Sequence, residues 1–286
     1  MRSYYHERKG EKDYTDLAIE RHAGLPSAEG VEYKSRECGV GIWETVRIYN
    51  SDGEESLGRR IGRYHTLSTG RLDLLSEDEI EDLCEEIAKM LCCTVDSLNC
   101  IPERMLVVGL GNAKLTPDSF GSRAAETVKP TLHIRNFDER MFHALECSEI
   151  AVICPGVSAD TGVDSLEIIR GVSKRICPDI IIAIDALATE DEARLGSTVQ
   201  ISDAGLYPGG GVGNSAHALT EEAIGIPIIS IGIPTVIDSR AFKKEERKRS
   251  IGESMLVSPR EIDDIITVGA RIVGGAINQA FGISGY

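Results

Sequence analysis

The chain has 286 residues, of which 42% are hydrophobic and 27% charged, and a net charge of −15. This length suits one large α/β domain or two small ones, and the acidic balance argues against direct binding of nucleic acid. The N-terminus has no apolar core of signal-peptide length, and prolines and glycines interrupt the longest apolar region, 223–237. A membrane span is therefore not expected. Eight cysteines without a CxxC pair predict reduced thiols in the cytosol, not a zinc site.

The first third of the chain predicts an arm, two strands and a helix. Residues 1–30 are polar and weakly periodic, and we interpret them as a mobile or removable arm. Residues 39–49 alternate as a strand does, Ser51-Asp52-Gly53 supplies a turn, and 59–68 is expected to pair as a second strand. Ser76-Glu77-Asp78-Glu79 is a capping box. It begins a helix whose apolar positions recur at helical spacing, namely Ile80, Leu83, Ile87 and Leu91.

From residue 104 onward, strands and helices alternate. The predicted strands are 104–110, 149–154, 179–184, 198–202 and 227–232. The predicted helices are 118–128, 138–146, 163–176, 218–224 and about 259–281. Three of these strands are apolar nearly throughout, which is typical of parallel strands covered by helices on both faces. The predicted architecture is α/β, a three-layer α/β/α domain with a mostly parallel sheet and an N-terminal β-rich extension at about 31–70.

Four unusual segments are expected at the carboxyl ends of strands, where open parallel sheets bind ligands. They are GLGNAKLTPDSFG at 109–121, PGVSADTG at 155–162, Asp185 after the run DIIIAI, and GLYPGGGVGN at 205–214. The convergence of these segments is the functional signal. No GxGxxG in a strand–helix context, P-loop or GxSxG elbow occurs, so nucleotide-dependent and serine-hydrolase chemistry is not favoured, and no cysteine has an activating context.

Two aspartates are candidates for acid–base chemistry. Thr116-Pro117-Asp118 resembles a helix start with Thr116 as N-cap, so Asp118 either complements the helix dipole or serves a site. Asp185 is expected to end a buried strand, where carboxylates are rare unless paired or used, although it could instead cap 186–190. If the two approach each other, they can share one proton. One then acts as base on a water while the other donates to a carbonyl oxygen.

Two alternatives stay open at this point. With a third ligand, the same carboxylate pair could hold a divalent ion; the spare candidates are Asp160, Asp203, Asp238 and His217. The glycines at 205–214 permit either a close backbone approach and an anion nest or a flexible surface loop.

Five segments in order resemble the germination protease family of spore-forming bacteria. They are Thr15–Glu20, GLGNAKLTPDSFG, PGVSADTG, IAIDALA at 182–188, and QISDAGLYPGGGVGN followed by IGIPTVID at 231–238. The resemblance implies a fold similar to that of hydrogenase-maturation proteases. It also implies an atypical aspartic endopeptidase that degrades small acid-soluble spore proteins in the spore core during germination. A homotetramer with no cofactor, no metal, no nucleic-acid partner and no membrane partner is expected.

The resemblance also assigns residues. Asp118 and Asp185 match the family's two proposed catalytic aspartates. The family is made as a zymogen, and its cleavage motif places self-processing between Asp16 and Leu17. This implies a propeptide of residues 1–16, a single peptidase domain of residues 17–286, and an inactive precursor when residues 1–16 are present. The expected substrate-binding positions are Gly111, Asn112, Thr161, Gly162, Gly211, Gly213 and Asn214.

The chain departs from the family pattern after Asn214, where Ser215-Ala216-His217 replaces the usual basic residues. Two other hypotheses remain beside the aspartic endopeptidase. One is a metal-dependent maturation-type endopeptidase that uses the same carboxylates as ligands. The other is a non-catalytic binder of spore proteins, although such a binder needs no cleavage site in its own arm.

Overall fold

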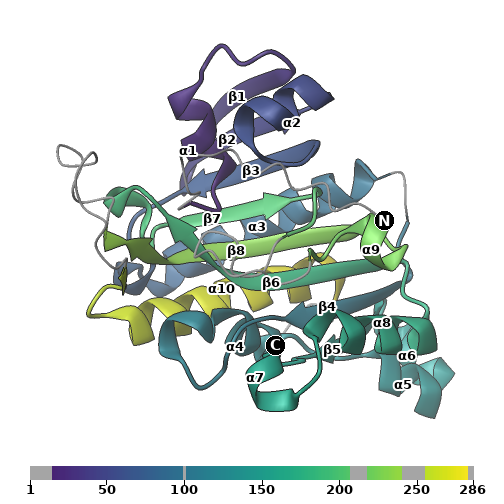
Figure 1. Cartoon of the computed structure of the whole chain (residues 1–286). Helices are drawn as coiled ribbons and strands as arrows, with labels where there is room; N and C mark the ends of the chain where they lie inside the picture. Colours follow the sequence, from purple (N-terminus) through teal and green to yellow (C-terminus); the bar gives the residue numbers. More distant parts are fainter. Residues whose placement is uncertain (1–14, 99–100, 207–217, 240–254, 283–286) are drawn as a thin grey trace.

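The structure is a computed structural model that describes residues 15–98, 101–206, 218–239 and 255–282. In these ranges nine strands form one sheet in the order β1-β2-β3-β7-β8-β6-β4-β5, and β9 pairs with β8 (Figure 1). The strands are β1 Val31–Cys38, β2 Gly41–Ile48, β3 Gly62–Ser68, β4 Arg104–Gly109, β5 Glu149–Ile153, β6 Ile180–Thr189, β7 Thr198–Ser202, β8 Ile228–Asp238 and β9 Leu256–Val257.

The centre of the sheet is parallel and its remainder is antiparallel. Strands β8, β6, β4 and β5 run parallel to one another. Strand β7 pairs antiparallel with β8 and with β3, and β3 continues through β2 to β1. The α/β prediction is confirmed, and the sheet as a whole is mixed. The N-terminal β-rich extension is joined to the core because β3 and β7 share a ladder.

Helices cover both faces of the sheet. The described α-helices are α1 Ala18–Gly24, α2 Ser51–Leu57, α3 Glu77–Asp96, α4 Phe120–Thr127, α5 Leu132–Phe137, α6 Glu139–Ala144, α7 Ser158–Thr161, α8 Ser165–Ile176, α9 Glu221–Ile224 and α10 Ile262–Phe281, and the 3-10 turns are η1 Leu72–Leu74, η2 Thr116–Asp118 and η3 Glu192–Arg194. Helices α3, α4 and α10 pack on one face through the largest apolar cluster. Helix α8 packs on the other face, and α1 covers the extension on that same face.

Several local predictions are confirmed. Both hydrogen bonds of the capping box between Ser76 and Glu79 are present, and the four apolar positions predicted for α3 are buried. The predicted strands and helices after residue 104 have counterparts in β4 to β8 and in α4, α6, α8, α9 and α10. None of the helices in the described ranges is both long enough and apolar enough to span a membrane.

Two predictions in the first half of the chain are wrong, and some elements there were not predicted. Residues 51–53 begin helix α2 instead of forming a turn, because the side chain of Asn50 caps it by accepting from the N–H of Gly53. Thr116 makes no side-chain cap for the helical segment that follows it. Strand β1 and helix α5 were not predicted. Strand β1 shows no burial alternation, since its residues are all exposed or half-buried.

The prediction that residues 1–30 form a mobile or removable arm is wrong for the residues from Thr15 onward. Residues 1–14 lie outside the described residues, but Thr15, Leu17 and Ala18 are almost fully buried, and α1 follows directly. The segment therefore belongs to the folded domain from Thr15 onward. Its polar composition hides the short apolar run Leu17-Ala18-Ile19, which packs against β2 and β3.

Candidate active site

Asp185 lies within strand β6, which runs on to Thr189. The prediction that Asp185 ends the strand is wrong, because β8 is also longer than predicted and pairs with β6 beyond this residue. The Asp185 side chain is 5% exposed, and its Oδ1 accepts from the N–H of Ala186 over 3.0 Å. Burial raises the pKa of Asp185 well above its ordinary value, and the nearby carboxylates of Asp118 and Asp16 raise this pKa further. This aspartate is therefore held in its protonated form more readily than an exposed one.

Asp118 reaches the site from the loop that follows β4. Gly111 has φ +94°, and a Cβ atom there would lie 2.0 Å from the carbonyl oxygen of Asp118, so only glycine permits this tight turn. The N–H of Asn112 donates to Oδ2 of Asp118 over 2.7 Å. Burial raises the pKa of Asp118, while the Asn112 N–H acts in the opposite direction. Gly111 and Asn112 thus position this carboxylate, in addition to any contact with substrate.

The loop that follows β5 lies beside the loop of Asp118. Lys114 Nζ and Asp160 Oδ1 form an ion pair at 2.9 Å that joins them. Gly162 ends α7 in the left-handed conformation, and Thr161 is exposed, with its hydroxyl bonded within its own loop. The predicted substrate contacts of Thr161 and Gly162 remain predictions. The other expected substrate-binding positions are Gly211, Gly213 and Asn214. They lie outside the described residues, as does His217, the spare metal-ligand candidate.

The predicted cleavage segment is docked at the carboxyl end of β6. Strand β4 ends opposite Ile184, and in the part of the chain that the structure describes no strand pairs with the following backbone groups of β6 on that side. Asp16 uses this edge: its N–H donates to the carbonyl oxygen of Ala188 over 2.9 Å, and its Oδ2 accepts from the N–H of Ala188 over 2.8 Å. The Asp16 side chain is thereby recognised by backbone groups close to Asp185.

The residues that follow Asp16 are buried or hydrogen-bonded in the fold as well. Leu17 and Ala18 are fully buried. The carboxylate of Glu20 accepts from the N–H of Glu190 over 2.8 Å and also from the hydroxyl of Thr189. The acidic, apolar, alanine and glutamate positions of the cleavage motif therefore each have a defined environment.

Sequence reasoning missed one residue of this region. Gln200 on β7 is buried and hydrogen-bonds to the backbone of Asp16 and Ala18 on either side of the predicted cleavage point. A signal for it exists in the sequence. In Thr198-Val199-Gln200-Ile201-Ser202, polar and apolar residues alternate, although every position is buried. Alternating polar residues on a fully buried strand indicate a polar environment on one face.

The spare carboxylate candidates have other partners or positions. Asp203 bonds to the backbone N–H of Arg63 over 2.5 Å and to its guanidinium over 3.1 Å. Asp160 pairs with Lys114 as described, and Asp238 lies buried at the end of β8. Within the described ranges, no group of three or more histidine, cysteine, aspartate or glutamate residues is arranged to hold a metal ion.

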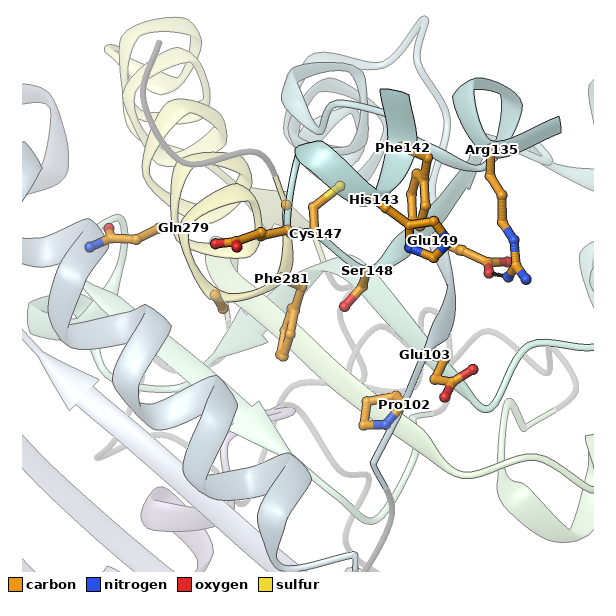
Figure 2. Close-up of a pocket in the computed structure, with 13 residues that line it drawn as sticks. Pro102, Glu103, Arg135, Phe142, His143, Cys147, Ser148, Glu149, Gln279 and Phe281 are labelled. Carbon is orange, nitrogen blue, oxygen red and sulfur yellow. Dashed lines mark ion pairs between the residues drawn. The ribbon is translucent and has the colours of Figure 1, made fainter. Parts of the chain in front are cut away.

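A separate cavity of about 470 Å³ lies where β4 and β5 begin, and Figure 2 shows residues that line it. Glu149, the first residue of β5, lines it and pairs with Arg135 of α5 and with Arg104 of β4, the latter at 2.6 Å. Both strands begin here, whereas the aspartates lie at their carboxyl ends. The buried charge of Glu149 is balanced by these two arginines, and the cavity is not part of the aspartate site.

The fold and the site together define a class of protein. A sheet with a parallel centre carries two aspartates at its carboxyl edge, both with raised pKa values, next to a bound stretch of extended chain. This arrangement defines an α/β protein whose candidate site lies at the carboxyl ends of parallel strands and holds two carboxyl groups suited to acid–base chemistry.

The comparisons with known proteins identify the family within this class. A model of the germination protease family matches residues 13–245. The germination protease of Caldanaerobacter subterraneus subsp. tengcongensis is 33% identical over 307 residues, which cover 93% of each chain. That of Priestia megaterium is 39% identical over 229 residues, which cover 78% of this chain and 61% of that protein. The chain belongs to the germination protease family, a family of peptidases.

One solved structure is also similar. The [NiFe] hydrogenase maturation protease HycI from Thermococcus kodakarensis KOD1 is 17% identical, covers 64% of this chain and 98% of its own, and has a TM-score of 0.36. The α/β architecture of the present chain rests on its own strand order and register.

Proposed function

We propose that the protein is a self-processing endopeptidase that initiates the degradation of small acid-soluble spore proteins during germination. Asp118 and Asp185 activate the attacking water, and residues 1–16 are a propeptide. One observation carries the proposal: Asp16, the residue before the expected cleavage point, is bonded through its N–H and its carboxylate to Ala188, three residues beyond Asp185 on β6, and its carboxylate raises the pKa of Asp185. Membership in the germination protease family supports the proposed substrate class. A homotetramer and a location in the spore core remain predictions.

The proposed reaction is a hydrolysis that needs one ionised and one protonated carboxyl group. The ionised member takes a proton from water as the water oxygen bonds to the carbonyl carbon of Asp16. The protonated member donates to the carbonyl oxygen. The bond to the nitrogen of Leu17 then breaks as the carboxyl group that took the water proton passes it to this nitrogen, and a hydroxyl of the intermediate returns a proton to the other carboxylate. The products are a new carboxyl group on Asp16 and a new amino group on Leu17. Asp185, the more deeply buried of the two, is the proposed proton donor.

The first test measures self-processing by intact mass in full-length variants. Asp185→Asn and Asp118→Asn are each expected to lower the rate of loss of residues 1–16 by at least about 1,000-fold, because an amide can neither accept nor supply the proton. Circular dichroism checks that both variants fold. Asp160→Asn is the matched control, since this neighbouring carboxylate pairs with Lys114 at the surface, and it should process at the wild-type rate. Retained processing in Asp185→Asn would contradict the assignment.

The second test follows wild-type processing at pH 5–6 and pH 7–8, with and without chelator. Burial raises the pKa of both aspartates, and the charges of Asp118 and Asp16 raise the pKa of Asp185 further. A state with one protonated carboxyl group therefore persists to higher pH than for ordinary aspartates and is lost as pH rises. Faster processing at the acid pH, unchanged by chelator, is expected. A block by chelator would instead support the metal-dependent alternative. Binding of a spore-protein peptide without cleavage at either pH would support the non-catalytic binder.

A further inference from the structure

Gln200 makes two hydrogen bonds that bracket the Asp16–Leu17 peptide bond. Its Nε2 donates to the carbonyl oxygen of Asp16 over 3.2 Å, and its Oε1 accepts from the N–H of Ala18 over 3.0 Å. A carbonyl oxygen can only accept and an N–H can only donate, so the two contacts agree on the orientation of the side-chain amide. The donated bond falls on the oxygen of the carbonyl group that water attacks in the proposed reaction.

Gln200 also lies in the same row of the sheet as Asp185. Gly232 of β8 is the register partner of Asp185 on β6 and of Gln200 on β7. Register partners on adjacent strands direct their side chains to the same face. Since adjacent strands lie about 4.8 Å apart, the two side chains begin about 10 Å apart. The glutamine amide is therefore bonded to the Asp16 carbonyl from one end of this row, and Asp185, whose pKa the Asp16 carboxylate raises, lies at the other end.

Gly232 keeps the position between them free of a side chain. A Cβ atom at residue 232 would lie 2.5 Å from the carbonyl oxygen of Asp185 and 2.8 Å from Cγ of Leu187. Any other residue would displace the end of β6, to which Asp16 is bonded. Asp185, Gly232 and Gln200 therefore form one row on the face of the sheet to which the cleavage segment is bonded through Gln200.

Capping of helix α1 explains only one of the two hydrogen bonds of Gln200. Ala18 is the first residue of α1, and the preceding residue provides no side-chain cap, so Oε1 of Gln200 satisfies an N–H at the helix start. That role needs an acceptor alone. The donor Nε2 is directed at the carbonyl of Asp16, which lies outside the helix. A donor placed on the attacked carbonyl before the reaction begins is the arrangement that stabilises an oxyanion.

We propose that Gln200 is a catalytic residue whose Nε2–H stabilises negative charge on the Asp16 carbonyl oxygen as water adds to its carbon. The inference rests on the proposed function, because it needs cleavage at this bond. When the water oxygen bonds to the carbonyl carbon, an electron pair moves to the carbonyl oxygen. The amide N–H is already directed at this oxygen and stabilises the charge that develops there before proton transfer from Asp185 is complete. The pair returns as the bond to the Leu17 nitrogen breaks. Removal of one such donor typically lowers a rate by about 100- to 1,000-fold.

The test separates the donor from the acceptor in the full-length protein. Gln200→Glu keeps an oxygen for the N–H of Ala18 and, when ionised at pH 7.5, has no hydrogen to donate. Gln200→Met removes both functions. The first-order rate of loss of residues 1–16 is measured by intact mass, and hydrogen exchange of residues 17–24 reports whether the segment stays docked. Gln279→Glu, the same substitution on α10 at the distant cavity, is the matched control (Figure 2).

We expect Gln200→Glu and Gln200→Met to process about 100-fold more slowly than wild type or worse, with residues 17–24 of Gln200→Glu still protected. The control should process normally. A rate within threefold of wild type for Gln200→Glu overturns the inference, as does a slow rate accompanied by loss of protection, which a capping role explains. If the wild-type chain itself never loses residues 1–16, the proposed function fails and the inference with it. Normal wild-type processing with an unimpaired Gln200→Glu refutes the inference alone.

Discussion

At the scale of single residues, the buried carboxyl group of Asp185 makes the folded state sensitive to pH. Its folded-state pKa is raised above the unfolded value of about 3.9, so the folded state binds more protons between these two pKa values. The free energy of unfolding therefore falls as pH rises through this window, and the stability present at low pH is lost. Each pKa unit by which folding raises the pKa of Asp185 lowers the free energy of unfolding at high pH by about 1.4 kcal/mol relative to low pH.

This argument predicts that Asp185→Asn stabilises the protein at neutral pH. The comparison is best made in an Asp118→Asn background, where processing does not interfere. The double variant should be more stable than Asp118→Asn by at least about 1.4 kcal/mol at pH 7, and the two should converge near pH 3. Urea unfolding at both pH values measures this difference. A double variant that is less stable at pH 7 would show that the ionised carboxylate is favourably solvated in the fold.

At the scale of elements, the end of β6 and the residue after it bind the segment Thr15–Glu20 through its backbone and through two carboxylates. The Glu20 carboxylate is the outer anchor, bonded to the N–H of Glu190 and the hydroxyl of Thr189, with Arg194 at 4.0 Å. Hydrogen bonds to charged groups contribute about 1.5–3 kcal/mol. Residues 17–24 stay packed in the fold after cleavage, so a substrate peptide with the same motif must compete with them for these contacts.

A peptide with the sequence of residues 12–23 tests this anchor. Replacing Glu20 by Gln in the peptide should lower kcat/KM by about 10- to 100-fold, because the amide loses the charge-assisted bonds. Thr189→Val in the enzyme should reduce the difference between the two peptides, since it removes one of the partners. Steady-state cleavage assays with processed protein provide the measurement. Equal kcat/KM values for the two peptides would show that Glu20 docks only in the intact chain.

At the scale of the whole molecule, the segment after the cleavage point is part of the core. Leu17, Ala18 and Ile19 pack with Val46, Ile48, Leu57, Tyr64 and Ala204, which join α1 to the N-terminal strands on the Gln200 face of the sheet. Removal of residues 1–16 leaves this cluster intact. Removal of residues 1–24 deletes two large buried side chains and the helix that carries them. Deleting a large buried side chain costs about 2–5 kcal/mol.

Two truncated chains test where the folded domain begins. A chain that starts at Leu17 should unfold in urea with nearly the stability of the processed protein. A chain that starts at Leu25 should be less stable by about 4 kcal/mol or more, or fail to fold. If the chain that starts at Leu25 were equally stable, the cluster around α1 would not contribute to the core, and the whole segment 1–24 would be a removable arm.

Much of the fold was predictable because its signals are local. The capping box at Ser76, the apolar spacing of α3 and the buried runs before Gly109 and Asp185 each specify an element through neighbouring residues. Elements whose burial depends on distant partners were missed or shortened. Strand β1 lacks alternation because only its ladder with β2 defines it. Strand β6 extends past Asp185 because β8 continues beside it.

The sequence by itself determined the α/β class, the loops at the carboxyl ends of strands and, through its ordered motifs, the candidate pair Asp118 and Asp185. Only the tertiary structure decided how the cleavage segment meets them. The contacts of Asp16 with Ala188 and with Gln200 join residues more than 170 positions apart in the chain. They depend on strand register, and register is set by the packing of the whole sheet, which no local pattern contains.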